Sequence, residues 1–128
     1  MVHSLRKYAY GTLLLIAFLA GCKQEPAEDP QDLIGYWEIQ EAYRNSQQTE
    51  SLDELFFEFF EDGTMRTNIS GIPTDAVYEV KGNTVQQRET DMEVDYTIQE
   101  ATDSILILST TIRDFNFRFA LRKRIPQE

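Results

Sequence analysis

The sequence predicts an all-β domain: an eight-stranded antiparallel barrel of the up-and-down type, placed after a signal peptide and a flexible tether. Three observations lead to this prediction. From Leu33 onward, apolar and polar side chains alternate with a period of two, which is typical of strands with one buried face. Turn residues interrupt the alternation about every ten residues. No segment has the length and the helical spacing of apolar side chains that a long amphipathic helix requires.

Residues 1–21 have the features of an export signal. Arg6 and Lys7 make its start positive, and an apolar run centred on residues 13–19 follows, too short for the ~20 residues of a membrane-spanning helix. The segment ends in Leu19-Ala20-Gly21-Cys22, with small residues directly before the cysteine. This ending resembles the lipobox of bacterial lipoprotein precursors. The resemblance implies cleavage before Cys22 and a lipid-anchored protein of the bacterial cell envelope; the alternative is an ordinary secretory signal with a chance cysteine.

Residues 22–32 are expected to form a lipidated flexible tether. Positions 23–32 hold two prolines and four acidic residues but almost no apolar side chain, so they cannot bury enough surface to become ordered. Lys23, directly after the lipidated cysteine, is not the aspartate that marks inner-membrane retention in enterobacterial lipoproteins. We therefore expect attachment to the outer membrane rather than to the inner membrane.

Residues 33–125 are expected to form the barrel domain, followed by a short tail at 126–128. The eight strands are expected at residues 34–44, 55–60, 65–69, 76–80, from 85 onward, 94–98, 105–108 and 115–121. Asp62-Gly63 is a strong signal for a tight hairpin between the second and third strands, and Lys81-Gly82-Asn83 is a turn signal between the fourth and fifth. The longest connection, 44–53, has room for one helical turn at most. A two-sheet sandwich would show the same alternation, so the periodicity leaves barrel and sandwich open.

The inward-facing side chains are apolar and rich in aromatic rings. Such rings either fill an eight-stranded barrel or line a pocket for one small lipid-like or aromatic molecule. The residues expected inside the barrel or in contact with a ligand are Ile39, Phe57, Phe59, Tyr78, Tyr96, Phe117 and Phe119. The bulk of these rings favours a filled or shallow interior over a deep cavity.

Four short motifs, in order and at the right spacing, resemble those of small bacterial lipocalin-like domains. They are Gly35-Tyr36-Trp37, Phe59-Phe60-Glu61-Asp62-Gly63-Thr64, Tyr78-Glu79-Val80-Lys81-Gly82-Asn83-Thr84 and the strand ending in Leu121-Arg122-Lys123-Arg124. The resemblance implies an eight-stranded calycin-type barrel closed at one end by Gly35 and Trp37. It also implies a basic residue of the last strand, Arg122 or Arg124, packed on the indole. It implies no reaction, because a fold alone does not give a function.

The composition excludes several kinds of catalysis. His3 is the only histidine and Cys22 the only cysteine, so the predicted mature chain has no histidine base and no free thiol. Serine–histidine and cysteine–histidine mechanisms and metal sites of histidine or cysteine are therefore not expected. Asp91, Glu93 and Asp95 put three carboxylates on one face, but they match no calcium-loop pattern and are expected to be solvated. We expect no enzyme, no cofactor and no metal.

The chain is strongly acidic, with a formal charge of −10. Loss of Arg6 and Lys7 with the signal would leave 10 of the 12 basic residues against all 22 acidic ones, or −12. Such a field repels nucleic acid. Residues 75–103 carry eight acids and two bases, whereas residues 113–124 carry five bases and one acid.

These charges leave two functions open beside a purely structural role in the envelope. The barrel binds a small hydrophobic ligand, or the acidic strands dock a cationic envelope protein. The basic residues of the last strand are expected to pair across it, with Arg118 and Arg122 facing Glu38 and Tyr36 of the first strand.

Overall fold

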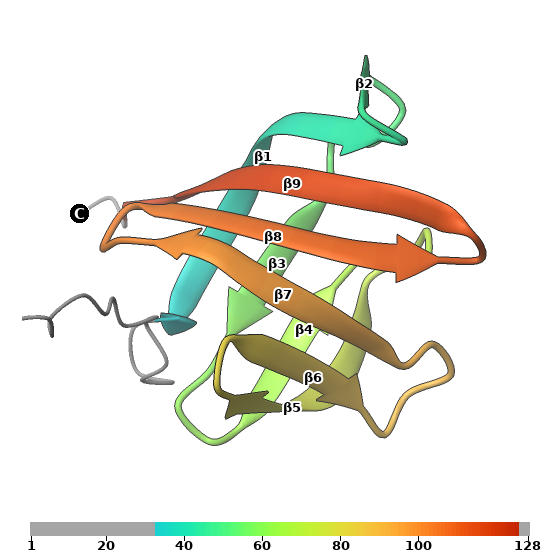
Figure 1. Cartoon of the computed structure of the whole chain (residues 1–128). Coiled ribbons are helices and arrows are strands. Elements are labelled where there is room, and N and C mark those ends of the chain that lie inside the picture. The colour runs from blue at the N-terminus through green and yellow to red at the C-terminus, as the bar shows by residue number, and fades with distance from the viewer. Residues whose placement is uncertain (1–32, 126–128) are drawn as a thin grey trace, which may run out of the picture.

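Nine strands follow one another along residues 33–125, the part of the chain that the computed structural model describes (Figure 1). They are β1 (Gly35–Arg44), β2 (Gln47–Thr49), β3 (Phe56–Phe59), β4 (Thr64–Thr67), β5 (Thr74–Lys81), β6 (Thr84–Arg88), β7 (Val94–Ala101), β8 (Ile105–Ile112) and β9 (Phe115–Lys123). From β3 to β9 each strand pairs with the next, β1 pairs with β3, and β9 returns to pair with β1. This closure confirms the predicted eight-stranded antiparallel barrel and excludes the open sandwich. Within the described residues no helix is long and apolar enough to cross a membrane.

The predicted signal peptide, the tether with Cys22 and the tail at 126–128 lie outside the described residues. The buried core, from Leu33 to Leu121, lies in the described part of the chain, so a chain that starts at Lys23 contains it.

The connection after β1 contains a strand that the sequence did not predict. It begins with a hairpin in which β2 pairs with the end of β1, and a turn over residues 51–54 follows. The two turn residues, Asn45 and Ser46, have φ values of 52° and 71°, as in the tight turns that match the twist of a hairpin. The amide N–H of Asn116 in β9 donates to Asn45 Oδ1 (3.0 Å), which fixes this hairpin against the barrel.

Two β-bulges change which side chains face inward. In β1 the pairing with β9 shifts between Ile39 and Glu41, so that Ala42 rather than Glu41 turns into the core. In β7 a similar shift lies between Ile98 and Glu100. One extra residue reverses the alternation beyond it and bends the strand, which helps a sheet to close.

The two ends of the barrel differ. The closed end holds the turns 60–63, 82–83 and 102–104 and the start of the described chain at Leu33; the open end holds the loops 45–55, 68–73, 89–93 and 113–114. At the closed end Trp37 is fully buried and its indole N–H donates to the carbonyl of Leu33 (2.8 Å).

The basic residue over the Trp37 ring is Lys123, whose Nζ lies 5.1 Å from the ring centroid. The expectation that Arg122 or Arg124 occupies this place is corrected. Arg122 faces outward on β9, opposite Glu38 in the ladder, and Arg124 pairs with Glu38 on the outer surface. Strand alternation turns residue 123, and not its neighbour 122, toward the barrel axis.

Gly35 and Lys123 fit closely at this end. A Cβ atom on Gly35 would lie 3.0 Å from the Lys123 side chain, and the φ of Gly35 is +138°. Both observations explain why the position before Tyr36 and Trp37 is glycine.

Candidate ligand site at the open end of the barrel

A pocket of about 470 Å³ opens between the four loops of the open end. Its lining residues are Leu52, Ile69, Ser70, Asp91, Met92, Ile112, Arg113, Phe115 and Phe117. Each of the four loops, together with the strand ends beside it, contributes at least one of them. Most of these side chains are apolar, and the volume lies in the range of small-molecule sites. We call this hollow the open-end pocket.

The floor of the open-end pocket is the top of an aromatic column. The rings of Phe115 and Phe117 are 6.4 Å apart, and Phe117 stacks on Phe119 at 5.8 Å. Phe119 then contacts Phe57 (6.1 Å), which packs edge-on against Tyr96 (5.2 Å). Because these rings occupy the barrel below Phe117, the open-end pocket is shallow.

The structure distributes the seven predicted interior residues unevenly. Phe57, Phe59, Tyr96 and Phe119 are at most 1% exposed and pack on one another in the core. Tyr78 lies near the closed end, where its hydroxyl donates to the carbonyl of Phe60 (3.1 Å), and Ile39 is half-buried against the core. Of the seven, Phe117 lines the open-end pocket.

Sequence reasoning missed most of the pocket wall. The missed residues are Leu52, Ser70, Met92, Ile112, Arg113 and Phe115, which lie in loops or at strand ends. Alternation does not reach such positions. The signal that could have found them is the apolar side chains, such as Leu52 and Met92, in otherwise polar connections.

A buried hydrogen-bonded chain joins the core to the pocket wall. The hydroxyl of Tyr96 donates to Gln87 Oε1 (2.7 Å), and Gln87 Nε2 donates to the carbonyl of Met92 (2.7 Å). Tyr96 is fully buried and Gln87 is 2% exposed. The chain satisfies these polar groups and fixes the loop that carries Met92.

No protein-family model and no curated protein sequence matches this chain. Its structure is similar to the crystal structure of a lipocalin-like protein from Bacteroides uniformis ATCC 8492, with a TM-score of 0.55 and 17% sequence identity. The match covers 73% of this chain and 99% of that one. The domain has a lipocalin-like fold. At this identity the likeness shows the fold alone, and a function has to be argued from this chain's own residues.

The acidic strands of the lipocalin-like domain are partly neutralised. Asp75 pairs with Arg66 (2.9 Å), Glu79 with Lys81 (3.7 Å) and Asp95 with Arg88 (2.7 Å). Arg122 lies opposite Glu38 in the ladder, as expected, whereas Arg118 lies opposite Tyr43 and over its ring at 5.5 Å. Arg124 forms the ion pair with Glu38 and lies over the ring of Tyr36.

The described residues contain no group of three or more histidine, cysteine or carboxylate side chains placed to hold a metal ion. Glu93 Oε2 accepts the amide N–H of Glu89 (3.3 Å), and Asp91 borders the open-end pocket. The three carboxylates at 91, 93 and 95 thus have separate surroundings.

Tyr96→Phe is expected to reduce the alkaline loss of stability. Burial raises the pKa of Tyr96 well above its ordinary value of 10.0. Above pH 10 the unfolded chain therefore releases a proton that the folded barrel keeps, and stability falls by about 1.4 kcal/mol per pH unit for this group. Burial also raises the pKa of Tyr78, which acts in the same direction.

Urea unfolding at pH 7 to 11 measures this effect. At pH 7 Tyr96→Phe should cost about 1–2 kcal/mol, because Gln87 loses a buried donor. Above pH 10 the difference from the native chain should shrink. If the difference in unfolding free energy between the variant and the native chain stayed the same from pH 7 to 11, the raised pKa of Tyr96 would be contradicted.

The turn between β8 and β9 is strained at the pocket wall. Arg113 and Asp114 have φ values of 53° and 73°, which is the left-handed conformation that asparagine and glycine adopt at low energetic cost. Aspartate tolerates this region, whereas arginine there costs about 1 kcal/mol or more. Because Arg113 also lines the open-end pocket, the strain favours a role for its side chain in that pocket.

Arg113→Asn combined with Asp114→Gly is expected to raise the free energy of unfolding by about 1 kcal/mol, a rise in Tm of about 4–8 °C. Thermal unfolding measures it. Asp103→Gly serves as the control because Asp103 lies in a turn without a positive φ, and it should lower Tm. A lower Tm for the Arg113–Asp114 double variant would show that the native turn between β8 and β9 is not strained.

Proposed function

We propose that this chain is a lipid-anchored lipoprotein of the bacterial cell envelope whose lipocalin-like barrel binds a small hydrophobic molecule in the open-end pocket. The observation that carries the proposal is an apolar pocket of about 470 Å³ ringed by Leu52, Met92 and Ile112. Phe115 is 45% exposed at its rim, and Ile72 on the neighbouring loop is 67% exposed. Phe60 (39% exposed) and Ile125 (77% exposed) lie at the closed end, so the apolar lining of the open-end pocket, and not exposure alone, favours ligand binding there.

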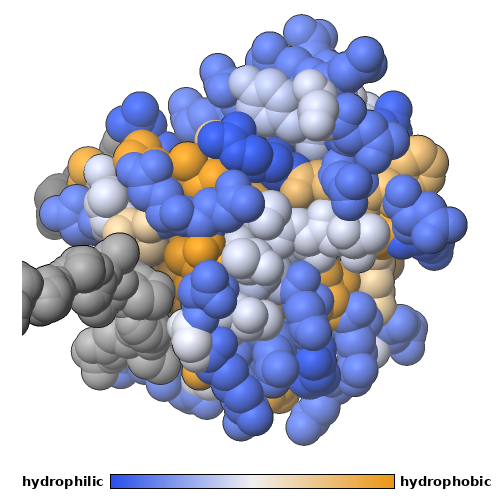
Figure 2. Space-filling view, viewed as in Figure 1, coloured by the Kyte–Doolittle hydropathy of each residue, from blue (hydrophilic) through white to orange (hydrophobic). Residues whose placement is uncertain are grey.

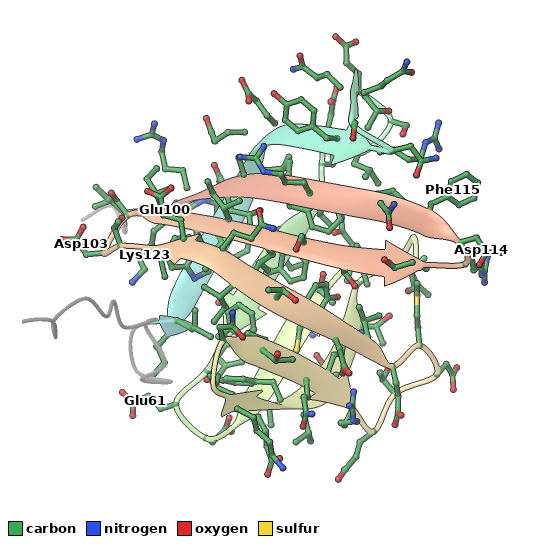
Figure 3. All side chains as sticks on the ribbon, viewed as in Figure 1. Glu61, Glu100, Asp103, Asp114, Phe115 and Lys123 are labelled. Carbon is green, nitrogen blue, oxygen red and sulfur yellow. The ribbon has the colours of Figure 1, made fainter. Side chains whose placement is uncertain are left out.

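The position of the pocket fits an anchored receptor. Figure 3 places Phe115 and Asp114 at one end of the barrel and Lys123, Glu100 and Asp103 at the other. The described chain begins at the end of Lys123. A ligand would therefore enter from the side that faces away from the start of the domain.

Native mass spectrometry tests the proposal. A chain of residues 23–128 is exposed to a lipid extract of its host and then sprayed from a volatile buffer. We expect one adduct per chain, with a mass on the order of a few hundred daltons. A bare mass across repeated extracts would refute ligand binding.

Cys22→Ala is expected to release the protein from the membrane fraction. Without the thiol no lipid can attach, and several acyl chains are needed for stable anchoring. Fractionation followed by immunoblotting should find most of the variant in the soluble fraction. Gln24→Ala, which leaves the lipobox intact, should stay with the membrane. A Cys22→Ala chain that stays there too would show that another segment anchors it.

The competing proposal is a protein-interaction module that docks a cationic envelope protein. It is favoured by three carboxylates around the closed end, Glu61, Glu100 and Asp103, which form no ion pair within residues 33–125 (Figure 3). Ionic strength separates the two proposals. Docking through these acids would weaken as salt rises, whereas burial of an apolar ligand would not.

A further inference from the structure

The wall of the barrel opens between β7 and β8 on the side of the open end. Their ladder starts at the pair Thr97 and Ser109 and continues toward the closed end. Beyond that pair a side chain replaces the ladder, because Thr110 Oγ1 donates to the carbonyl of Asp95 (2.7 Å). Figure 1 shows the two strands diverging from this level.

A groove of about 780 Å³ lies over this opening. Its lining residues are Arg88, Glu93, Val94, Asp95, Thr97, Ser109, Thr110, Thr111, Asn116 and Phe117. Four of these side chains carry hydroxyls and one an amide. We call it the β7–β8 groove.

The charges of the β7–β8 groove disfavour an anionic group. Arg88 is the basic residue in the lining, and its guanidinium is paired with Asp95 at 2.7 Å. Glu93 adds a further carboxylate. A carboxylate or phosphate of a ligand would be repelled by Glu93 and Asp95, and Arg88 is already paired with Asp95. Thr110 and Thr111 already donate to the carbonyl of Asp95 and to Asn116 Oδ1, and Ser109 Oγ accepts from Gln99. Within the described residues, the hydroxyl of Thr97, the O–H of Ser109 and the amide N–H groups of Asn116 remain to match an uncharged group with several hydroxyls.

The polar groove and the apolar pocket adjoin. Phe117 lines both of them, and its neighbour Asn116 lies in the groove. In Figure 2 hydrophobic residues show between hydrophilic ones on this face. One molecule that passes Phe117 could therefore bury an apolar chain and keep a polar head outside.

We propose that the ligand is an amphipathic lipid with an uncharged, hydroxyl-rich headgroup such as a sugar. Its apolar chain would occupy the open-end pocket, and its headgroup would bind the hydroxyls of the β7–β8 groove. This inference rests on the proposed function, because it assigns the ligand class of the same pocket. The inference adds that the site selects among headgroups, which burial of an apolar chain alone would not require.

The test compares molecules with one chain and different heads: octyl β-glucoside below its micelle concentration, 1-octanol, octanoate and octylammonium. Kd is measured by NMR titration of the chain 23–128. The glucoside should bind about fivefold or more tightly than octanol, since one to two net hydrogen bonds are gained. Octanoate should bind more weakly than the glucoside.

Thr97→Val combined with Thr111→Val removes two groove hydroxyls and keeps their shape. Both residues are exposed or near the surface, so the variant should fold, which its Tm checks. It should lower glucoside affinity to that of octanol and leave octanol binding unchanged. Equal affinity of the native chain for both molecules, or a preference for octanoate or octylammonium, overturns the headgroup inference while the pocket stands. Failure of all four molecules to bind overturns the pocket as well.

Discussion

Phe57→Ala lowers the free energy of unfolding by about 3–5 kcal/mol, the largest loss we expect from a single substitution in the domain. Phe57 is fully buried, and its ring contacts those of Phe59, Tyr96 and Phe119. Removal of the ring leaves a cavity in the middle of the aromatic column, and the closed wall of the barrel allows little collapse into it. Thermal unfolding should show a fall in Tm of about 12 °C or more.

Phe56→Ala is the matched control. Phe56 precedes Phe57 on β3, points to the outer face and stacks on Tyr36 with ring centroids 5.1 Å apart. It is half-buried, so truncation should cost about 1–2 kcal/mol, clearly less than at Phe57. Equal losses at the two positions would contradict the column as the main source of stability.

Ile112→Asp is expected to weaken binding of 1-octanol by about tenfold or more. Ile112 ends β8 in the wall of the open-end pocket. A carboxylate at this position holds water in the pocket. The apolar chain of the alcohol then buries less surface, which weakens its binding by about 1.5 kcal/mol or more. Isothermal titration calorimetry of the chain 23–128 measures the Kd.

Ile107→Asp provides the control for this change. It lies on the same strand and is half-buried, but it is on the outer face, opposite Ala120 in the ladder. The outer-face variant should keep the Kd of the native chain. If both variants lose binding equally, the loss reflects general damage to β8 and not the pocket.

The barrel could be predicted because its signals are local. Asp62-Gly63 forms the expected hairpin turn: Gly63 has a φ of +88°, and Asp62 Oδ1 accepts the amide N–H of Thr64 (3.0 Å). Alternation correctly turned Phe57 and Phe59 inward. It failed beyond Ile39, because a bulge reverses the alternation and depends on the pairing of β1 with a strand some 80 residues away.

The candidate site was harder to predict for the same reason. Leu52, Met92 and Ile112 meet at one end of the barrel only after β9 has closed on β1, and nothing in their local sequence joins them. The lysine on Trp37, by contrast, could have been predicted, because the alternation that turns Phe117 and Phe119 inward also places Lys123 on the inner face. Contacts between residues that meet only when the barrel closes cannot be predicted from any single segment of the sequence.

The measurement that tests the central claim most directly is a chemical-shift map of the chain 23–128 titrated with 1-octanol. We expect saturable shifts confined to the open end, in the amides of Leu52, Met92, Ile112 and Phe117, with the indole N–H of Trp37 at the closed end unchanged. Shifts centred on Trp37, or none at all up to the solubility limit of the alcohol, would contradict a binding site at the open end.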